Sequence, residues 1–419
     1  MTDFQPNTNN PFAFKRLRIL FLAPFAPQLQ ASHGGGRVIA QLIAQLARRH
    51  SIGLCYLHAA EEPPMDDALR EFCEIVEEVI LPERQVNGVK RWFQRLRVWK
   101  DLIAGKPLWA IDRFSPAYGE RVKTLLKDWR PDIVQLEFHI MGQYLPSFAD
   151  DPTPRILVQH EPGEESAREN RSSAFIQGRI IPELDLHAWK RFEREVIRQV
   201  QTVVVFTERD RQAVRKLGGQ TPIVQIPLGT EVSALSLHRV QEEPLSLLFV
   251  GNFKHLPNLD AADRLINKIF PHVQSQFPQA CLFIVGEHLP SNIVQVPNEN
   301  VILTGYVPDV RPYLDRATLV VVPLRLGGGM RVKVLEALAA GKPIVASSRA
   351  VEGVRLVNGE QAILAEDDDE FGQAIVDLLR DSQKRASLAS RAWDWANENL
   401  GWDRVADEYE ALYLRLLRC

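Results

Sequence analysis

The chain has 419 residues, of which 45% are hydrophobic and 25% charged, with a formal net charge of −3. Such a length exceeds one ordinary hydrophobic core and suits two globular domains. The near-neutral charge creates no field that would recruit nucleic acid, so no nucleic-acid partner is expected. The cysteines are scattered without a Cys-x-x-Cys pair, which excludes the usual zinc and disulfide frameworks: Cys55, Cys73, Cys281 and Cys419.

The beginning of the chain predicts neither a signal peptide nor a membrane span. Residues 1–15 read as a tail, polar from Thr2 to Asn10, without the charged-then-apolar order of a signal peptide. No segment approaches the roughly 20 apolar residues that a bilayer-crossing helix needs. We therefore expect a cytoplasmic protein whose only membrane contact would be peripheral.

The first half of the chain alternates between short apolar runs and helical patterns. Residues 17–23 are a continuous apolar run typical of a central parallel strand. Apolar residues then recur with a 3.6-residue rhythm from Val38 to Leu46, which predicts a helix. Further strands are expected at 51–57, 79–81, 132–137, 155–160, 202–206 and 223–226, and helices over 64–77, 88–129, 182–199 and 208–217.

Residues 230–244 are polar or small and predict a linker, after which the alternation restarts. Strands are expected at 245–250, 281–285, 301–303, 319–324, 343–347 and 362–364, and helices over 258–274, 309–315, 331–340, 367–381, 384–398 and 401–418. Two successive alternating series predict an α/β protein with two doubly wound, Rossmann-like parallel sheets. We expect an N-terminal domain over 1–235, a second domain over 236–398 and a last helix over 399–419. Ligands of such sheets bind beyond the carboxyl ends of the strands.

The segment from Pro323 to Pro343 reads as a strand, a glycine-rich turn and a helix. Its helix would begin with two cations, Arg331 and Lys333, where the helix dipole is already positive. Cations there are unfavourable unless an anion binds between them, so the pattern predicts a phosphate site. Glu336 lies on the same helical face and could accept hydrogen bonds from sugar hydroxyls. The alternative is a surface helix start with an internal salt bridge, but three glycines would then lower stability without a packing return.

A second glycine run, Gly34-Gly35-Gly36 followed by Arg37, comes after the first strand. It is either a flexible turn or a place where the backbone closely approaches a substrate across the cleft between the domains. That substrate would be the one that carries the phosphate or the acceptor. Arg37 could assist in that contact.

Polar side chains also follow two other strands of the first domain, where ligands are expected. His160 and Glu161 come after one of them, and Glu137 ends another, with His139 as a weaker candidate. His160 could hydrogen-bond a sugar or simply cap the strand, and Glu137 could serve the same site or form a loop salt bridge.

Two charged segments have plain explanations beside functional ones. Residues 90–100 mix cations with tryptophans on an expected helix, which is either a solvated basic face or a contact with anionic lipid. Asp367–Asp369 precede a helix, where the dipole favours acids, so they predict no metal site.

With these motifs the chain resembles the GT-B glycosyltransferases, and among them glycosyltransferase family 4, from about Arg18 to the C-terminus. The residues that carry the resemblance are Gly34–Gly36, Thr207-Glu208, Val250-Gly251-Asn252, Gly286-Glu287, Gly305-Tyr306, Leu335-Glu336-Ala337 and Gly341-Lys342-Pro343. The family pattern is Glu-x7-Glu, with Glu336 as its second member. Gly328 stands where the first glutamate belongs, so the chain is similar to a Gly-Gly-Gly-x-Arg-x-Lys branch. Lys254 is the one match to the family's basic pair after the first strand of the second domain.

The resemblance implies two Rossmann-like domains facing a cleft, with the last helix crossing back to the first domain. It implies transfer of a sugar, with retention, from a nucleotide-diphosphate donor to a glycan or lipid-linked acceptor in polysaccharide synthesis. No permanent cofactor and no metal are implied. The implied catalytic residues are His160, Arg331, Lys333 and Glu336; the implied acceptor or sugar contacts are Glu137, His160, Glu161 and Arg37; the implied donor contacts are Gly34, Gly35, Gly36, Gly251, Lys254, Gly286, Tyr306, Val307, Gly328, Gly329, Met330, Arg331, Lys333 and Glu336.

Thr207 itself reads as a helix N-cap, although relatives use this loop near the donor. Gly305 to Val307 could clamp a nucleotide base or form a plain turn. Two other functions stay open: a sugar-nucleotide epimerase of the same fold, and a non-catalytic module that binds a nucleotide or glycan.

Overall fold

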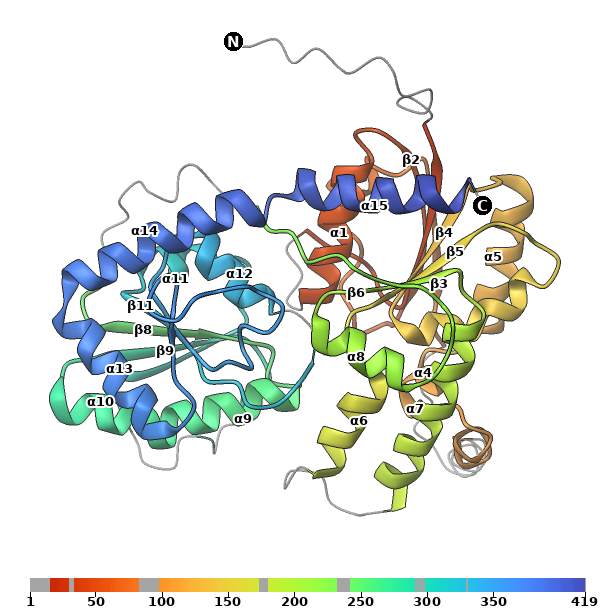
Figure 1. Ribbon diagram of the computed structural model, residues 1–419. Helices are drawn as coiled ribbons and strands as arrows, with labels where there is room; N and C mark the ends of the chain where they lie inside the picture. The colour runs from red at the N-terminus through yellow and green to blue at the C-terminus, as the bar shows by residue number, and fades with distance from the viewer. Residues whose placement is uncertain are drawn as a thin grey trace, which may run out of the picture.

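The structure, a computed structural model, consists of two lobes, each a parallel sheet covered by helices on both faces (Figure 1). It describes residues 16–29, 34–82, 98–172, 180–231, 242–290, 293, 298–328 and 331–418. The expected α/β class with two doubly wound domains is confirmed.

The N-terminal sheet has seven parallel strands in the order β3-β2-β1-β4-β5-β6-β7. They are β1 (Arg18–Ala23), β2 (Ser51–His58), β3 (Ile75–Ile80), β4 (Ile133–Glu137), β5 (Arg155–Gln159), β6 (Thr202–Val205) and β7 (Ile223–Gln225). Every residue of β1 after Arg18 is buried, because helices cover both faces of a central parallel strand. That double burial explains why the strand reads as one apolar run.

The helices of this domain differ from expectation in four places. They are α1 (Gly34–Leu46), α2 (Asp67–Arg70), α4 (Leu108–Asp112), α5 (Pro116–Asp128), the 3₁₀ segment η1 (His139–Phe148), α6 (Gly163–Ser172), α7 (Ile180–Arg198) and α8 (Glu208–Lys216). The helix expected over 64–77 is wrong: only α2 is helical there, and β3 begins at Ile75, where β-branched residues pair with β2. Helix α1 begins at Gly34 rather than after the glycines, and η1 and α6 were not expected.

The second sheet has six parallel strands in the order β10-β9-β8-β11-β12-β13. The strands are β8 (Ser246–Val250), β9 (Cys281–Val285), β10 (Val301–Gly305), β11 (Leu319–Val322), β12 (Ile344–Ala346) and β13 (Ile363–Leu364). The helices are α9 (Leu256–Arg264), a π-helical turn (Leu265–Ile269), α10 (Phe270–Gln276), α11 (Arg311–Arg316), α12 (Val332–Ala339), α13 (Asp368–Arg380) and α14 (Ser382–Asn399). The helix expected over 258–274 is thus α9, the π-helical turn and α10 in succession.

The last helix, α15 (Trp402–Leu416), lies along the N-terminal lobe, whereas α14 lies along the other lobe (Figure 1). Its buried Tyr413 donates a hydrogen bond to Gln135 Oε1 at 2.5 Å, in the middle of β4. On the surface, Arg49 Nη1 pairs with Asp407 Oδ1 at 2.5 Å and with Glu410 Oε2 at 2.7 Å. The C-terminal residues therefore close the chain onto the first domain, while the domain limits at 235 and 398 stay predictions.

Helix starts in both domains follow from short side chains that accept backbone hydrogen bonds. Thr207 Oγ1 accepts from the Asp210 amide at 3.0 Å at the start of α8, which confirms Thr207 as an N-cap. Asp367 Oδ1 accepts from the Glu370 amide at 2.8 Å and caps α13 in the same way. No group of three or more metal-ligating side chains occurs in the described ranges.

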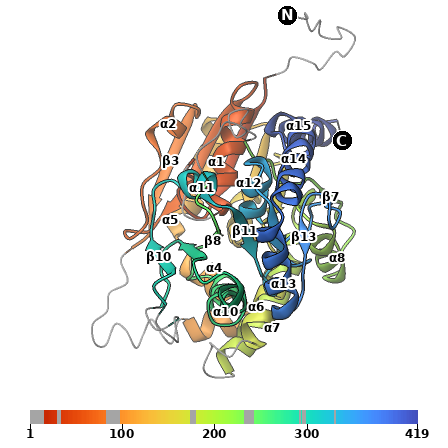
Figure 2. The same cartoon turned by 90° about the vertical axis from the view of Figure 1, so that its left-hand side faces the viewer.

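The order of strands opens a crevice in each sheet. In the first sheet, β1 has β2 on one side and β4 on the other, so the connections that leave β1 and β4 diverge. In the second sheet, β8 and β11 have the same relation. The helices that follow β1 and β11 are α1 and α12, which lie near one another in both views (Figures 1 and 2). Of the helices formed by described residues, none is both long and apolar enough to cross a membrane.

Candidate functional site

The N-termini of α1 and α12, one from each domain, are in contact. A Cβ atom added to Gly34, the first residue of α1, would lie only 2.9 Å from Cγ2 of Val332, the first residue of α12. The partial positive charges of both helix ends therefore act on one region between the domains. An anion placed there would be stabilised by both helices.

Charged side chains surround this contact. Arg37 Nη1 on α1 forms an ion pair with Glu336 Oε1 on α12 at 2.5 Å, which joins the two domains directly. Lys333 Nζ donates to Asn258 Oδ1 at 2.6 Å and lies 4.6 Å from the centre of the Phe249 ring. Arg331 is the N-cap residue of α12, and its Nη2 donates to the Leu326 carbonyl at 3.3 Å. Three cations thus accompany one carboxylate beside two helix N-termini, and the excess is positive.

The pKa values of this cluster record that excess. Burial lowers the pKa of Lys333 to about 7, and the neighbouring Arg331 and Arg37 lower it further while Glu336 opposes them. Burial raises the pKa of Glu336, which Arg37 and Lys333 partly offset. A bound polyanion would supply the negative charge that keeps Lys333 protonated.

The glycines of the first run have a steric explanation. Gly35 lies beneath an aromatic ring, since a Cβ on it would come 2.7 Å from Phe138 Cζ, and Gly34 faces Val332 across the domain boundary. Both lie in the first turn of α1, so the interpretation of this run as a loop is wrong. The close approach that these glycines permit, in the structure, is to protein side chains.

The second run differs, because its backbone requires glycine. Gly327 has φ +91°, a conformation that side-chain-bearing residues avoid. Arg209 Nη1, from α8 of the other domain, donates to the Gly327 carbonyl at 3.4 Å. Gly328 stands opposite Pro162, Arg209 and Asp210, with room for a Cβ at 3.5 Å or more from each. Gly329 and Met330, which the sequence also assigned to this site, lie outside the described residues.

His160 and Glu137 come together at the ends of β5 and β4. His160 Nε2 lies 2.7 Å from Glu137 Oε2, and both residues are buried. The imidazole stacks on the Phe138 ring at 3.8 Å between centroids, with an angle of 7° between the planes. Phe138 has φ +66°, unusual for a bulky residue, so the backbone is strained where it places this ring. The alternative readings of a capping histidine and a loop salt bridge give way to one buried histidine–carboxylate pair.

The remaining candidates lie around this cluster: Gly251 packs beside Asn258, the partner of Lys333, and His139 lies near His160. A Cβ on Gly286 would come 1.8 Å from the Gly251 carbonyl oxygen. These two glycines therefore allow the segments that follow β8 and β9 to pack closely. Lys254 has an exposed side chain. Tyr306 is 58% exposed, and Val307 beside it is half-buried; both follow β10, which β9 and β8 separate from β11. His139 and Glu161 line another cavity of the first domain.

Sequence reasoning missed three residues that shape this region: Phe138, Asn258 and Arg209. Asn258 ends the Gly251–Asn258 segment that follows the first strand of the second domain, and its amide oxygen accepts from Lys333. Arg209 follows Thr207-Glu208 and pairs with Glu165 at 3.1 Å and with Glu352 at 3.5 Å as well as with Gly327. Glu208 instead pairs with Arg211 of its own helix at 3.2 Å. In the sequence, the only signal for these three residues is that each lies next to a motif.

Comparison with known proteins gives a consistent result. Residues 244–381 match the family described as Glycosyl transferases group 1. The lipopolysaccharide core biosynthesis mannosyltransferase LpcC of Rhizobium leguminosarum bv. viciae is 28% identical over 176 residues, which are 40% of this chain and 50% of that protein. Such matches span between 22% and 50% of the length of the curated relatives.

Two solved structures are similar over nearly the whole chain. Sucrose-phosphate synthase from Thermosynechococcus elongatus has a TM-score of 0.71 at 17% identity, covering 96% of this chain and 100% of that one. Anabaena Alr3699/HepE, solved in complex with UDP-glucose, has a TM-score of 0.67 at 15% identity, covering 95% and 99%. Residues 244–381 therefore form a Glycosyl transferases group 1 domain, in a chain that has the two-domain fold of the GT-B glycosyltransferases.

Proposed function

We propose that this protein transfers a glycosyl group from a nucleoside-diphosphate sugar to an acceptor hydroxyl in the synthesis of a polysaccharide or lipopolysaccharide. The observation that carries the proposal is the contact between the N-termini of α1 and α12, with Arg37, Arg331 and Lys333 beside it. The negative charge of a diphosphate would balance the positive charge of these three side chains and of the two helix N-termini. The mannosyltransferase similarity and the UDP-glucose complex of HepE support a nucleotide-sugar donor.

In this proposal the second domain holds the donor. The diphosphate lies at the start of α12, where Lys333 and Arg331 contact its oxygens as charge-assisted hydrogen-bond donors. Glu336, one helical turn further, accepts hydrogen bonds from hydroxyls of the sugar that is transferred. Arg37, which pairs with Glu336, must then release this carboxylate or share it with the sugar. The exposed Tyr306 and its neighbour Val307 serve the nucleotide base, and Gly328 leaves space for the sugar.

The chemical step breaks the bond between the sugar C1 and the diphosphate oxygen, and forms a bond between C1 and the acceptor oxygen. The diphosphate keeps the electron pair and takes up the proton that the acceptor hydroxyl loses. Lys333, Arg331 and the amides of α12 stabilise the negative charge that develops on the leaving group. His160, held by Glu137 and Phe138, donates or accepts a hydrogen bond at the sugar beside C1.

We further propose that the anomeric configuration is retained. Glu137 is the carboxylate nearest to His160 in this arrangement, and it already accepts from His160 and from Gln135 Nε2 at 2.5 Å. A buried carboxylate engaged twice in this way is a poor nucleophile. Attack by the acceptor on the face that the diphosphate leaves is the route that these residues support.

The acceptor binds in the first domain, and closure of the two domains excludes water from the step. A peripheral contact with anionic lipid through residues 90–100, on the cytoplasmic side, stays part of the proposal for a lipid-linked acceptor. Of that segment only residues 98–100 lie within the described ranges, and Trp99 among them is 39% exposed.

The test is to incubate the chain with UDP-, GDP- and ADP-sugars and to measure release of the nucleoside diphosphate, alone and with candidate acceptors. We expect release with one donor, and the sugar first set free should keep the donor's anomeric configuration in NMR spectra. Lys333→Met should weaken diphosphate affinity by about 10- to 100-fold, because charge-assisted hydrogen bonds are worth about 1.5–3 kcal/mol. Lys384→Met, which removes an exposed lysine from α14, is the matched control. Unchanged affinity in Lys333→Met would refute the placement of the diphosphate.

The buried His160–Glu137 pair also suits an epimerase, which needs acid–base groups beside a sugar carbon. Such an enzyme would exchange a carbon-bound hydrogen of the sugar with solvent. The same NMR experiment in D2O decides between the two: deuterium in the sugar ring indicates epimerisation, and transfer or release without ring deuterium indicates glycosyl transfer. Binding of a nucleotide without either reaction would indicate a non-catalytic module.

A further inference from the structure

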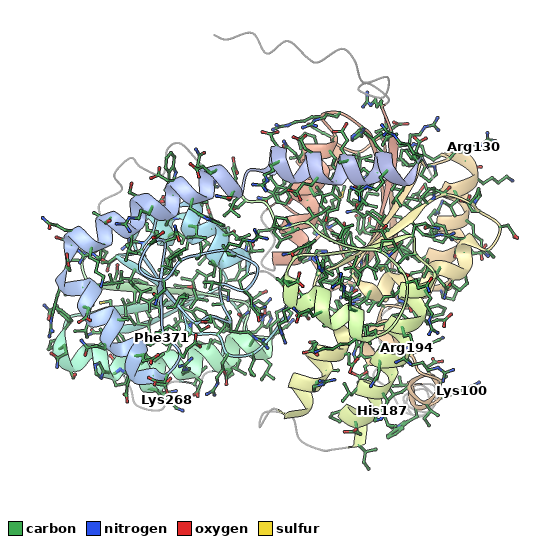
Figure 3. The ribbon with its side chains drawn as sticks, viewed as in Figure 1. Lys100, Arg130, His187, Arg194, Lys268 and Phe371 are labelled. Carbon is green, nitrogen blue, oxygen red and sulfur yellow. The ribbon has the colours of Figure 1, made fainter. Side chains whose placement is uncertain are left out.

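A separate cavity lies in the first domain between α4, α6 and α7, with a volume of about 300 Å³. Its walls combine two indoles, three carboxylates and an imidazole, from Trp109, Trp189, Asp112, Glu161, Asp185 and His139. Neither lysine nor arginine occurs among the described residues that line it. The helices that form it are at the end of the lobe away from α15, where Figure 3 shows Lys100 and His187.

His139 gives this cavity a buried polar group without a well-aligned partner. The imidazole is 1% exposed and lies edge-on to Trp109 and Trp189, at 5.6 Å and 4.5 Å between ring centroids. Its described polar contact is with the Glu161 backbone, which raises its pKa slightly, and neither nitrogen reaches full hydrogen-bond geometry. Burial, followed by the nearby His160, lowers the pKa of His139 to about 3, so the ring is neutral at physiological pH. A buried imidazole with only one poorly aligned partner gains free energy when a ligand supplies a well-aligned one.

The wall formed by α6 is held in a defined position. Glu193 Oε1 accepts from the Gly163 amide at 2.7 Å, and Glu193 Oε2 accepts from the Glu164 amide at 2.8 Å. The Glu193 side chain is fully buried, so this cap fixes the first turn of the helix. A rigid wall favours a binding site over an accidental gap.

The cavity adjoins the proposed reaction centre. Glu161 and Gly163 line it, and Pro162 between them approaches Gly328 of the other domain, with its Cδ 3.6 Å from where a Cβ would be. His139 is two residues from Glu137, which holds His160. A sugar ring in the cavity could therefore present one hydroxyl toward the donor site.

We propose that this cavity binds the acceptor sugar, and that it prefers an uncharged or amino-bearing ring to one that carries phosphate or carboxylate. The inference rests on the proposed function, since it names the substrate class of the same reaction. The indoles offer flat apolar faces for the ring, and the carboxylates accept hydrogen bonds from its hydroxyls or amino group. The same carboxylates repel an anion in a partly desolvated site. The volume is near the lower limit of about 300 Å³ for small-molecule sites, which suits one ring.

The test uses the full chain, saturated with the nucleoside diphosphate that it binds, and three probes with one ring type: methyl glucopyranoside, glucosamine and glucose 6-phosphate. Saturation-transfer NMR with titration gives their affinities. We expect the first two probes to bind and glucose 6-phosphate to bind at least about tenfold more weakly, the size of one unfavourable charge contact. Equal or tighter binding of glucose 6-phosphate would overturn the preference.

Variants locate the binding. Ala167→Met fills the cavity from α6 and should weaken both binding probes by about tenfold, as expected when a hydrogen-bonded ligand is displaced. Asp112→Asn, at an exposed position of the wall, should weaken glucosamine more than methyl glucopyranoside. Asp128→Asn makes the same charge change on α5, away from the cavity, and should alter neither affinity.

The two proposals can fail separately. If nucleoside diphosphate binds but no probe binds, or if Ala167→Met leaves probe affinity unchanged, the cavity is not the acceptor site and the transferase proposal stands. If the chain binds no nucleoside diphosphate, the proposed function itself fails. Thermal unfolding of Ala167→Met shows whether that variant is folded. If it is not folded, the probe affinities of Asp112→Asn decide whether the cavity binds the probes.

Discussion

The two glycine runs, Gly34–Gly36 and the run that begins at Gly327, look alike in the sequence and differ in the structure. The first lies inside a helix, where Val332 and Phe138 leave no space for a Cβ atom. The second begins in a left-handed backbone conformation at Gly327 and ends at the cations of α12. Both runs are closely packed, since a Cβ atom on Gly327 would come 2.7 Å from Arg331 Nη2 and 2.9 Å from Pro257 Cγ. Only the second run adds a positive φ and leads directly into a cluster of cations.

The largest stability effect is expected in the first run. Gly35→Ala should reduce the free energy of unfolding by about 1–3 kcal/mol, because the new methyl group overlaps the Phe138 ring. Phe138→Leu should recover part of that loss when the two changes are combined, and chemical denaturation measures the coupling. Gly401→Ala is the control, because its Cβ would meet nothing within 4 Å. If the double variant is no more stable than the sum of the single changes predicts, packing is not the reason for this glycine.

A smaller effect, with a different signature, is expected in the second run. Gly327→Ala should lower stability by about 1–2 kcal/mol through the strain of a positive φ. Gly359→Ala provides the matched control, because Gly359 has φ +82° with nothing within 4 Å of its Cβ position. Gly327→Ala should lose more than Gly359→Ala, because its Cβ atom would also meet Arg331 Nη2 at 2.7 Å and Pro257 Cγ at 2.9 Å. Arg331→Ala should relieve part of this difference, because it removes one of the two crowding side chains. Equal losses in Gly327→Ala and Gly359→Ala would show that the positive φ alone requires this glycine.

The fold could be predicted because buried parallel strands leave a clear record in the sequence. Strands such as β11, and β1 after Arg18, are covered on both faces, so their positions are all apolar, and helices with one buried face alternate with them. The prediction failed at β3, an edge strand in which Glu77 and Glu78 interrupt the apolar residues, so that the segment resembled a helix. It also missed α6, whose first turn depends on a cap from the distant Glu193.

The candidate site was predictable only as far as its chemistry is local. Arg331, Lys333 and Glu336 share one helix, so their spacing alone places them together. The Arg37–Glu336 pair joins residues 299 positions apart, and no local pattern contains it. The Phe138 ring likewise packs between His160 and Gly35, which are far from one another in the sequence, so no local pattern predicts its place.

The protonation of Lys333 links the second run to function. Its pKa falls from 10.5 to about 7 in the folded protein, so the native state binds fewer protons than the unfolded state between these values. Stability should accordingly rise with pH through this window. A bound diphosphate reverses the effect, because its negative charge favours the protonated amine and raises the pKa again.

The most direct measurement is therefore proton uptake on nucleoside-diphosphate binding, by titration calorimetry at about pH 8 in buffers of different ionisation enthalpy, where a free diphosphate is already ionised. We predict uptake of a substantial fraction of a proton per complex by the natural chain and much less by Lys333→Met. Lys384→Met should behave as the natural chain does. Tight binding without proton uptake, or uptake that Lys333→Met leaves unchanged, would contradict a diphosphate site at the start of α12.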